Sequence, residues 1–258
     1  MKKLIRSLFG TLLGSGALYA LSLQFIERFP ETSNIHPALK EAPFQTDTDA
    51  KPFLFEYRGT GYYVEPVQDY EISGLVVSHN NISSIADAYH TSSSVDFKDL
   101  CVVWGQNAKK DLLDQMTFWS EPWTCWTRAD TPNAEGRFFP DELSNNHLLT
   151  KDDKIRELIN GVRIGDQVQL RGWLVNYAYQ ASPDFARKSS LVRTDTGNGA
   201  CETIFVTEAK VLKTANAGWR SLHGVTRASS LFLLVLLPLL WFWDIQVTHK
   251  KRRDELAE

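Results

Sequence analysis

The sequence predicts a mainly β domain of the α+β class, flanked by an N-terminal and a C-terminal transmembrane helix. An apolar run lies near each end of the chain, at residues 8–26 and 229–247. Each run has roughly the 20 residues that a helix needs to cross about 30 Å of hydrocarbon. Between them, short runs of aromatic and β-branched residues alternate with turn residues, a pattern typical of strands. The domain between the helices therefore occupies residues 51–213, which is long enough for one hydrophobic core.

The C-terminal apolar run is uncharged from Ser229 to Trp243. A membrane helix tolerates its single proline, Pro238, because neighbouring groups can satisfy the freed carbonyl. Trp241 and Trp243 lie where an aromatic belt is expected, and the basic residues that follow mark this end as cytoplasmic. We therefore expect a transmembrane helix over residues 229–247.

The N-terminal run follows the basic residues of segment 1–7. A basic start before an apolar run is also typical of a cleaved signal peptide, for which the small residues at 15–17 would serve as the cleavage site. The apolar run continues well beyond them, which favours an uncleaved anchor over residues 8–26. Small residues, including Gly10 and Gly14, leave a face on which a second helix can pack closely.

Both outer segments, residues 1–7 and 248–258, are basic. The positive-inside rule therefore predicts a multi-pass protein with both termini in the cytoplasm. The domain would then lie on the far side of the membrane, joined to the helices by linkers 27–50 and 214–228. In a bacterium this is a periplasmic domain on the inner (cell) membrane, and a eukaryotic organelle is the alternative.

Charge and cysteine content exclude some classes of protein. A net charge of −3 argues against a nucleic-acid binder. Three cysteines without C-x-x-C spacing are too few for a disulfide scaffold. Outside the cytoplasm, the pair nearest in sequence, Cys101 and Cys125, would form a disulfide worth about 3 kcal/mol. Three buried thiols are the alternative.

Two of the predicted strands share a pattern with an interior glycine, Gly74 in one and Gly172 in the other. Such a glycine often marks a tight bend at the corner of a barrel. The stretch 165–174 resembles strands of OB-fold barrels, and this resemblance implies a small OB-like barrel. The other predicted elements are strands at 53–57, 62–64, 70–78, 99–105, 167–177, 190–193 and 201–212, and a helix with Thr150 as its N-cap that ends at Asn160 and Gly161.

Cys201 is the one candidate nucleophile that the sequence suggests. It follows a glycine-rich turn, where a thiol would lie beside backbone donors, and it would need a base such as His90 or His147. This reading predicts a membrane-tethered hydrolase or thiol-dependent enzyme. The alternative is a hairpin turn followed by a buried strand cysteine. The polar run that ends at His147 is predicted to be a turn before the helix.

A second polar region contains His79, Asp87, His90 and Asp96, residue types that suit zinc or manganese. Their spacing matches no known metal site, and the stretch has the composition of a solvated loop. The sequence therefore predicts neither a metal site nor a cofactor.

Three tryptophans, Trp119, Trp123 and Trp126, lie close together in the sequence. They predict either a binding surface for a ligand or partner, or the core of the domain. The chain contains no nucleotide-binding loop, zinc-helix motif or serine elbow, which favours a non-enzymatic role. The first hypothesis is therefore a periplasmic domain that binds a membrane or periplasmic protein, or a ligand, near the membrane, in assembly or envelope maintenance. The tryptophan segment would be its binding surface.

Overall fold

The computed structural model describes residues 2–82, 94–195 and 200–256. It divides the chain into two compact units. One unit contains Met1–Arg28 and Asn216–Glu258, and the other contains Phe29–Ala215.

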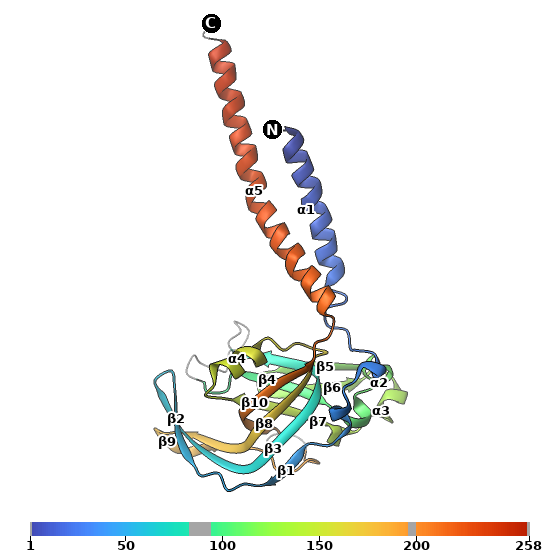
Figure 1. Cartoon of the computed structure of the whole chain (residues 1–258), viewed down its shortest axis with the longest axis vertical. Helices are drawn as coiled ribbons and strands as arrows, with labels where there is room; N and C mark the ends of the chain where they lie inside the picture. The colour runs from blue at the N-terminus through green and yellow to red at the C-terminus, as the bar shows by residue number, and fades with distance from the viewer. Residues whose placement is uncertain (1, 83–93, 196–199, 257–258) are drawn as a thin grey trace. The chain divides into compact units, whose positions relative to one another are not determined.

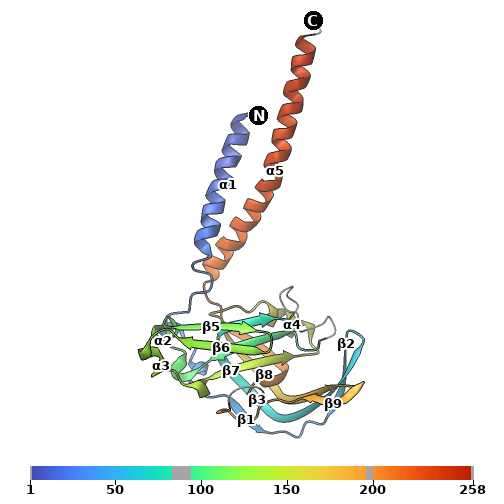
Figure 2. The same cartoon turned by 180° about the vertical axis from the view of Figure 1, so that it is seen from behind.

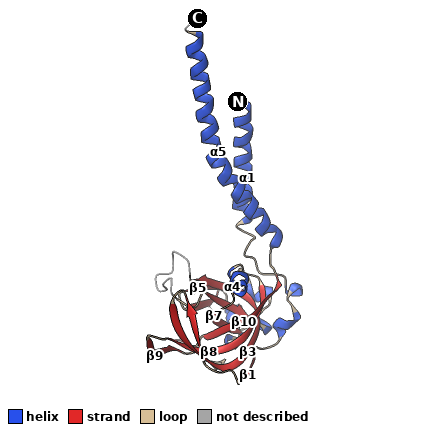
Figure 3. Cartoon of the chain, turned by 60° about the vertical axis from the view of Figure 1, so that its left-hand side comes forward, coloured by secondary structure: helices blue, strands red, loops and turns tan. Residues whose placement is uncertain are grey.

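The first unit consists of α1 (Lys2–Ser22) and α5 (Ala217–Glu255), and both helices are long and apolar enough to cross a membrane (Figure 3). The two helices contact each other through small and polar side chains. The hydroxyl groups of Ser15 and Ser230 lie 2.9 Å apart, and the Ser22 hydroxyl lies 3.0 Å from Nδ1 of His223. Such hydrogen bonds and small residues are typical of helix pairs in membranes.

The second unit is a mixed α/β domain built on a large sheet of eight strands (Figure 1). A separate hairpin and several short helices accompany the sheet. The strands are β1 (Phe44–Asp47), β2 (Phe53–Tyr57), β3 (Thr60–Asn81), β4 (Lys98–Val103), β5 (Met116–Glu121), β6 (Thr124–Ala129), β7 (Leu143–Leu149), β8 (Gln167–Tyr179), β9 (Ser182–Arg187) and β10 (Glu202–Lys213). The α-helices are α2 (Lys110–Leu113), α3 (Pro132–Glu135) and α4 (Asp153–Asn160), and the 3-10 helices are Thr32–Asn34, Pro37–Lys40, Gly105–Asn107 and Pro140–Glu142.

The strand pairings of the large sheet run from β3 through β4, β7, β10 and β8, and β8 pairs again with β3. The β7–β10 pair is parallel, whereas the other pairs are antiparallel. The two segments predicted as separate strands, 62–64 and 70–78, are parts of the single long strand β3. Its register against β8 shifts between Pro66 and Gln68, as expected where a proline removes a ladder donor.

The apolar core lies where alternate residues of these strands point inward. Its largest cluster includes Tyr70, Ile72, Leu100, Val102, Leu148, Leu170, Leu174 and Ile204. Gly172 of β8 is needed where β10 comes close, because a Cβ atom there would collide with the carbonyl oxygen of Phe205. The structure therefore explains Gly172 by the close approach of β10, whereas the bend at a barrel corner expected from the sequence stays a prediction.

Three local predictions differ from the structure. Helix α4 is capped by Asp152, whose Oδ1 accepts hydrogen bonds from the amides of Lys154 and Ile155, and not by Thr150. The predicted strand 190–193 is irregular, and β9 forms instead at 182–187. Pairing with β8 determines where this strand forms, and the local sequence pattern does not. The polar run before His147, predicted to be a turn, lies within β7.

Candidate active site

The candidate site lies on one face of three neighbouring strands, with β7 between β4 and β10. Asp99 of β4 and Thr203 of β10 are the register partners of His147 on its two sides. Because side chains alternate between the faces of a strand, Asn145 shares the face of His147, and Cys201 shares that of Thr203. The sheet therefore brings Asp99, His147, Asn145 and Cys201 together from distant parts of the sequence.

His147 forms a short hydrogen bond to Asp99, with 2.6 Å between Nδ1 and Oδ1. Both side chains are completely buried, at 0% and 1% exposure. Cys201 acts to raise the pKa of the imidazole, which places its thiol near the ring. Nε2 of His147 has no hydrogen-bond partner among the described residues, so the thiol and the imidazole do not form a hydrogen bond in this structure. Loose nucleophile–base contacts are common in enzymes without substrate.

Burial alone would lower the pKa of His147. The charge of Asp99 and its hydrogen bond, together with the nearby Cys201, outweigh burial and raise that pKa to about 9, although the charge of Arg187 opposes them. The imidazole therefore carries a proton at neutral pH and forms an ion pair with the Asp99 carboxylate.

Asn145 places a hydrogen-bond donor beside the sulfur. Its Nδ2 lies 3.4 Å from the Sγ atom of Cys201 and donates to the carbonyl oxygen of Trp123 at 3.1 Å. The same carbonyl lies 3.7 Å from Sγ. The thiol is thus held between an amide donor and a carbonyl acceptor.

Trp123 lies in the turn of the hairpin β5–β6; Figure 2 shows the two strands of this hairpin. The backbone of Trp123 has φ 70°, a left-handed conformation that is uncommon for a bulky residue and occurs here in a hairpin turn. Its ring lies 5.3 Å from that of His147, between centroids. Cys101 of β4 and Cys125 of β6 are paired as a disulfide, with 5.9 Å between Cα atoms, so the hairpin is tied to the sheet beside the site. This pairing agrees with the one expected from the sequence.

A groove of about 1110 Å³ opens over the thiol. Cys201 and Asn145 line the groove. His147 and Asp99 are buried and do not belong to its lining. The remaining lining is partly aromatic and apolar, from Trp123, Trp126, Phe138, Pro140 and Leu143, and partly charged, from Arg187, Lys188, Arg193, Asp195 and Glu202. The groove is large enough for a small organic substrate.

Several buried polar atoms without a hydrogen-bond partner lie in the groove lining or on the adjoining strands. The described part of the chain has eight such atoms: Asn145 Oδ1 and Arg187 Nε belong to residues of the lining, and His147 Nε2, Asp99 Oδ2 and Thr203 Oγ1 belong to buried residues of β7, β4 and β10. Folded proteins satisfy nearly all buried polar groups, so a cluster of unsatisfied atoms calls for an explanation. A site that binds and transforms a polar ligand provides one.

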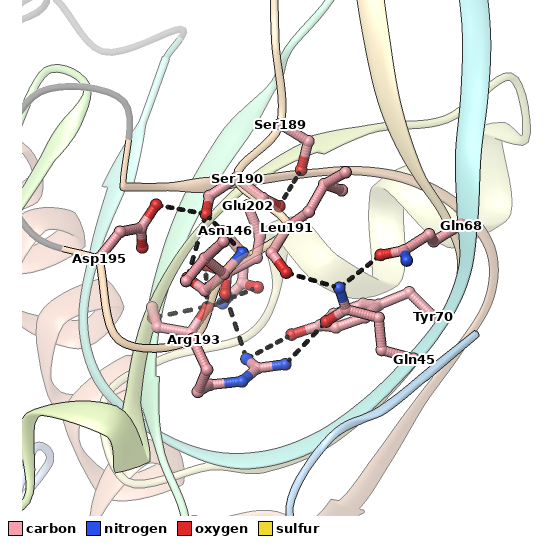
Figure 4. Close-up of polar contacts among 12 residues, drawn as sticks. Gln45, Gln68, Tyr70, Asn146, Ser189, Ser190, Leu191, Arg193, Asp195 and Glu202 are labelled. Atoms are coloured by element: carbon pink, nitrogen blue, oxygen red, sulfur yellow. Dashed lines mark hydrogen bonds and ion pairs between the residues drawn. The ribbon is translucent and has the colours of Figure 1, made fainter. Parts of the chain in front are cut away.

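A second polar network fixes the start of β10, next to Cys201 (Figure 4). The buried carboxylate of Glu202 accepts hydrogen bonds from Ser144 at 2.6 Å and from Arg193 at 3.1 Å. Arg193 also donates to the hydroxyl of Tyr70 at 3.1 Å. Burial raises the pKa of Glu202, while Ser144 and Arg193 act to lower it. These bonds anchor Arg193 and the start of β10 to the strands β3 and β7.

The other residues singled out in the sequence are dispersed. His90 and Asp87 lie outside the described residues. Trp123 and Trp126 line the groove, and Trp119 stacks on Trp126 with ring centroids 6.2 Å apart. The described residues contain no group of three His, Cys, Asp or Glu side chains that could hold a metal ion.

Asp99 and Asn145 are site residues that the sequence analysis missed. Each is a polar residue that the pattern placed at a strand end or in a turn. Their roles became visible only when the register of β4, β7 and β10 was known.

The raised pKa of His147 makes the stability of the domain depend on pH. The folded state holds this proton up to about pH 9, against a pKa of 6.5 for an unperturbed histidine. The stabilisation is therefore complete below pH 6.5 and is lost as the pH rises through 9. At about 1.4 kcal/mol per pKa unit, it amounts to roughly 3 kcal/mol.

We expect the thermal midpoint of the full chain in detergent to fall by roughly 10 °C more between pH 6 and pH 9.5 in the wild type than in Asp99→Asn. Asp99→Asn lacks the ion pair and controls for all other titrating groups. Equal pH dependence in the two proteins would contradict the assigned ion pair.

Comparison with known proteins adds no relative, because no protein-family model, no curated protein and no solved structure matches this chain.

Proposed function

We propose that the chain is a membrane-anchored, thiol-dependent hydrolase or acyl transferase. Cys201 is the nucleophile, His147 its proton donor and acceptor, and Asp99 the carboxylate that orients the imidazole. The observation that carries the proposal is the juxtaposition of the Cys201 thiol and the buried His147–Asp99 pair at the base of a groove. Nucleophile, base and orienting carboxylate in this relation are the signature of covalent catalysis.

The protonation state of His147 suits a thiol better than a hydroxyl. Cysteine reacts as a thiolate, and a neighbouring imidazolium stabilises that form. In the first half-reaction Sγ attacks the substrate's carbonyl carbon, the C–S bond forms, and the leaving group departs with the proton of His147. In the second half-reaction water or another acceptor gives a proton to His147, attacks the same carbon and releases Cys201. The raised pKa of His147 keeps the proton available for the leaving group.

Asn145 is placed to stabilise the charge that develops during both steps. Its Nδ2 lies 3.4 Å from Sγ, so an oxygen on the carbon bonded to sulfur comes within its reach. A preorganised amide donor at this position acts as part of an oxyanion hole.

We place the domain outside the cytoplasm, in the periplasm of a bacterium, between two helices that span the inner membrane. The basic residues at both ends of the chain favour this topology. The disulfide-bonding distance of Cys101 and Cys125 also fits an oxidising compartment. The fold inferred for the domain is a small OB-like barrel, supported by the ring of pairings β3–β4–β7–β10–β8.

An activated ester tests the proposed chemistry. Full-length protein in detergent, mixed with p-nitrophenyl acetate, is expected to release p-nitrophenolate in a burst as Cys201 becomes acetylated. Cys201→Ala is expected to remove the burst and leave the background rate. A burst that persists in Cys201→Ala would contradict the assignment of the nucleophile.

A second candidate function is the non-enzymatic binding of a protein partner near the membrane. It is favoured by the stacked and partly exposed pair Trp119 and Trp126, at 38% and 45% exposure. Such aromatics are enriched at protein interfaces. The variant Cys201→Ala distinguishes the two candidate functions, because it abolishes the enzymatic function and leaves binding through the tryptophan pair intact.

A further inference from the structure

Among the described residues of the groove beside Cys201, one guanidinium group has neither an ion pair nor a hydrogen bond. Arg187, the last residue of β9, lies with its Cζ 3.8 Å from the ring centroid of Trp123. Its Nε atom is buried without a hydrogen-bond partner, and its side chain has no ion pair within the described residues. A guanidinium partly removed from water normally has an anionic partner.

The other arginine of the groove differs in this respect. Arg193 is paired with Glu202 and hydrogen-bonded to Tyr70 and Gln45, so its donors are used within the protein. In contrast, no hydrogen bond to a described residue uses the N–H groups of Arg187. Because it stacks on Trp123, whose ring also packs against His147, its position relative to the site is fixed.

Arg187 is also close enough to the reacting groups to act on a substrate. Its charge lowers the pKa of His147, which places the guanidinium within electrostatic range of the imidazole. Both Arg187 and Cys201 line the groove. An anionic group held by Arg187 would therefore lie beside the carbon that Cys201 attacks.

We infer that Arg187 is a substrate-binding residue that recognises an oxyanion, a carboxylate or a phosphoryl group, close to the substrate's electrophilic carbon. The planar fork of a guanidinium matches such groups with two parallel hydrogen bonds. The aromatic and apolar side chains of the groove take the remainder of the substrate. This inference rests on the proposed function, since it names the substrate class of the same site.

Two alkylating reagents of equal shape and different charge test the inference. Iodoacetate and iodoacetamide both react when Sγ of Cys201 displaces iodide from the methylene carbon, so that an S–C bond forms and the C–I bond breaks. In the protein without reductant, Cys101 and Cys125 are protected by their disulfide. The ratio of the iodoacetate rate to the iodoacetamide rate then reports anion recognition separately from thiol reactivity.

Arg187→Gln is expected to lower this ratio by about tenfold, the effect of losing one charge-assisted interaction. Arg171→Gln removes the same charge from an exposed arginine outside the groove lining and is expected to change the ratio by less than about twofold, because solvent and salt screen it. Arg187→Lys keeps the charge without the fork and should give an intermediate ratio. An unchanged ratio in Arg187→Gln, or an equal fall in Arg171→Gln, would overturn the inference.

Competing anions distinguish the two kinds of oxyanion. Sodium acetate or inorganic phosphate, at equal ionic strength, is expected to slow iodoacetate alkylation of the wild type more than sodium chloride does, and the stronger competitor identifies the preferred group. Protection no greater than that by chloride would count against the inference. Failure of the proposed function has a different signature, namely an iodoacetamide rate that does not depend on His147.

Discussion

Replacement of His147 by alanine is expected to lower the rate of Cys201 acylation by about 100-fold, a typical contribution of a general acid–base residue. The variant loses the imidazolium whose charge favours a thiolate nucleophile, whereas p-nitrophenolate departs as an anion and needs no proton. The measurement is the burst rate of p-nitrophenolate release at pH 7 in full-length protein. Asp99→Asn is expected to reduce the rate as well, because the imidazole loses the carboxylate that orients it.

His79→Ala is the matched control for this experiment. It removes a second imidazole, largely buried, from β3 of the same sheet. The register partner of His79 is Leu100, which points to the face opposite Asp99. An equal loss of rate in His79→Ala would attribute the effect to damage of the fold, and an undiminished rate in His147→Ala would contradict the role of His147.

Arg193→Met is expected to destabilise the domain by about 3 kcal/mol, because it leaves the Glu202 carboxylate buried without its counter-charge. The thermal midpoint should fall by roughly 6–12 °C at pH 7. The deficit should shrink as the pH falls, because Glu202, whose pKa burial already raises, then takes up a proton and no longer needs the arginine.

Arg171→Met provides the comparison, since Arg171 forms its ion pairs with Glu71 and Glu208 on the surface and is 55% exposed. We expect a much smaller change there, because solvent screens exposed pairs. If the two variants lowered the midpoint equally, the network around Glu202 would have no special part in fixing the start of β10.

The sequence was most informative where a single physical property, such as hydrophobicity, determines the local structure. Uninterrupted apolar runs are enough to predict the two candidate membrane helices. The interior glycine Gly172 was noticed in the sequence as a possible bend, and the structure shows that it permits the close approach of β10. The disulfide pairing followed from sequence proximity. Strand boundaries were less predictable, because β9 depends on pairing with β8 and not on its own composition.

The site itself was predictable only in part. Cys201 and His147 could be named as a possible pair from their chemistry. The centre of β7, however, reads as Ser-Asn-Asn-His, and so polar a run predicts a turn and not a buried strand. Local rules fail where function places polar groups in the interior. Asp99 and Asn145 could be recognised only from the register that puts them beside His147 and Cys201.

The proposed chemistry requires that Cys201 becomes covalently acylated with the help of His147. Its most direct test is a peptide mass map of the full-length protein, quenched in acid shortly after mixing with p-nitrophenyl acetate. We predict an acetyl group on the peptide that contains Cys201 in the wild type, and only a trace of it in His147→Ala at the same time point. An acetyl group found instead on Lys188 or other surface amines, or equal labelling of Cys201 in both proteins, would contradict the proposal.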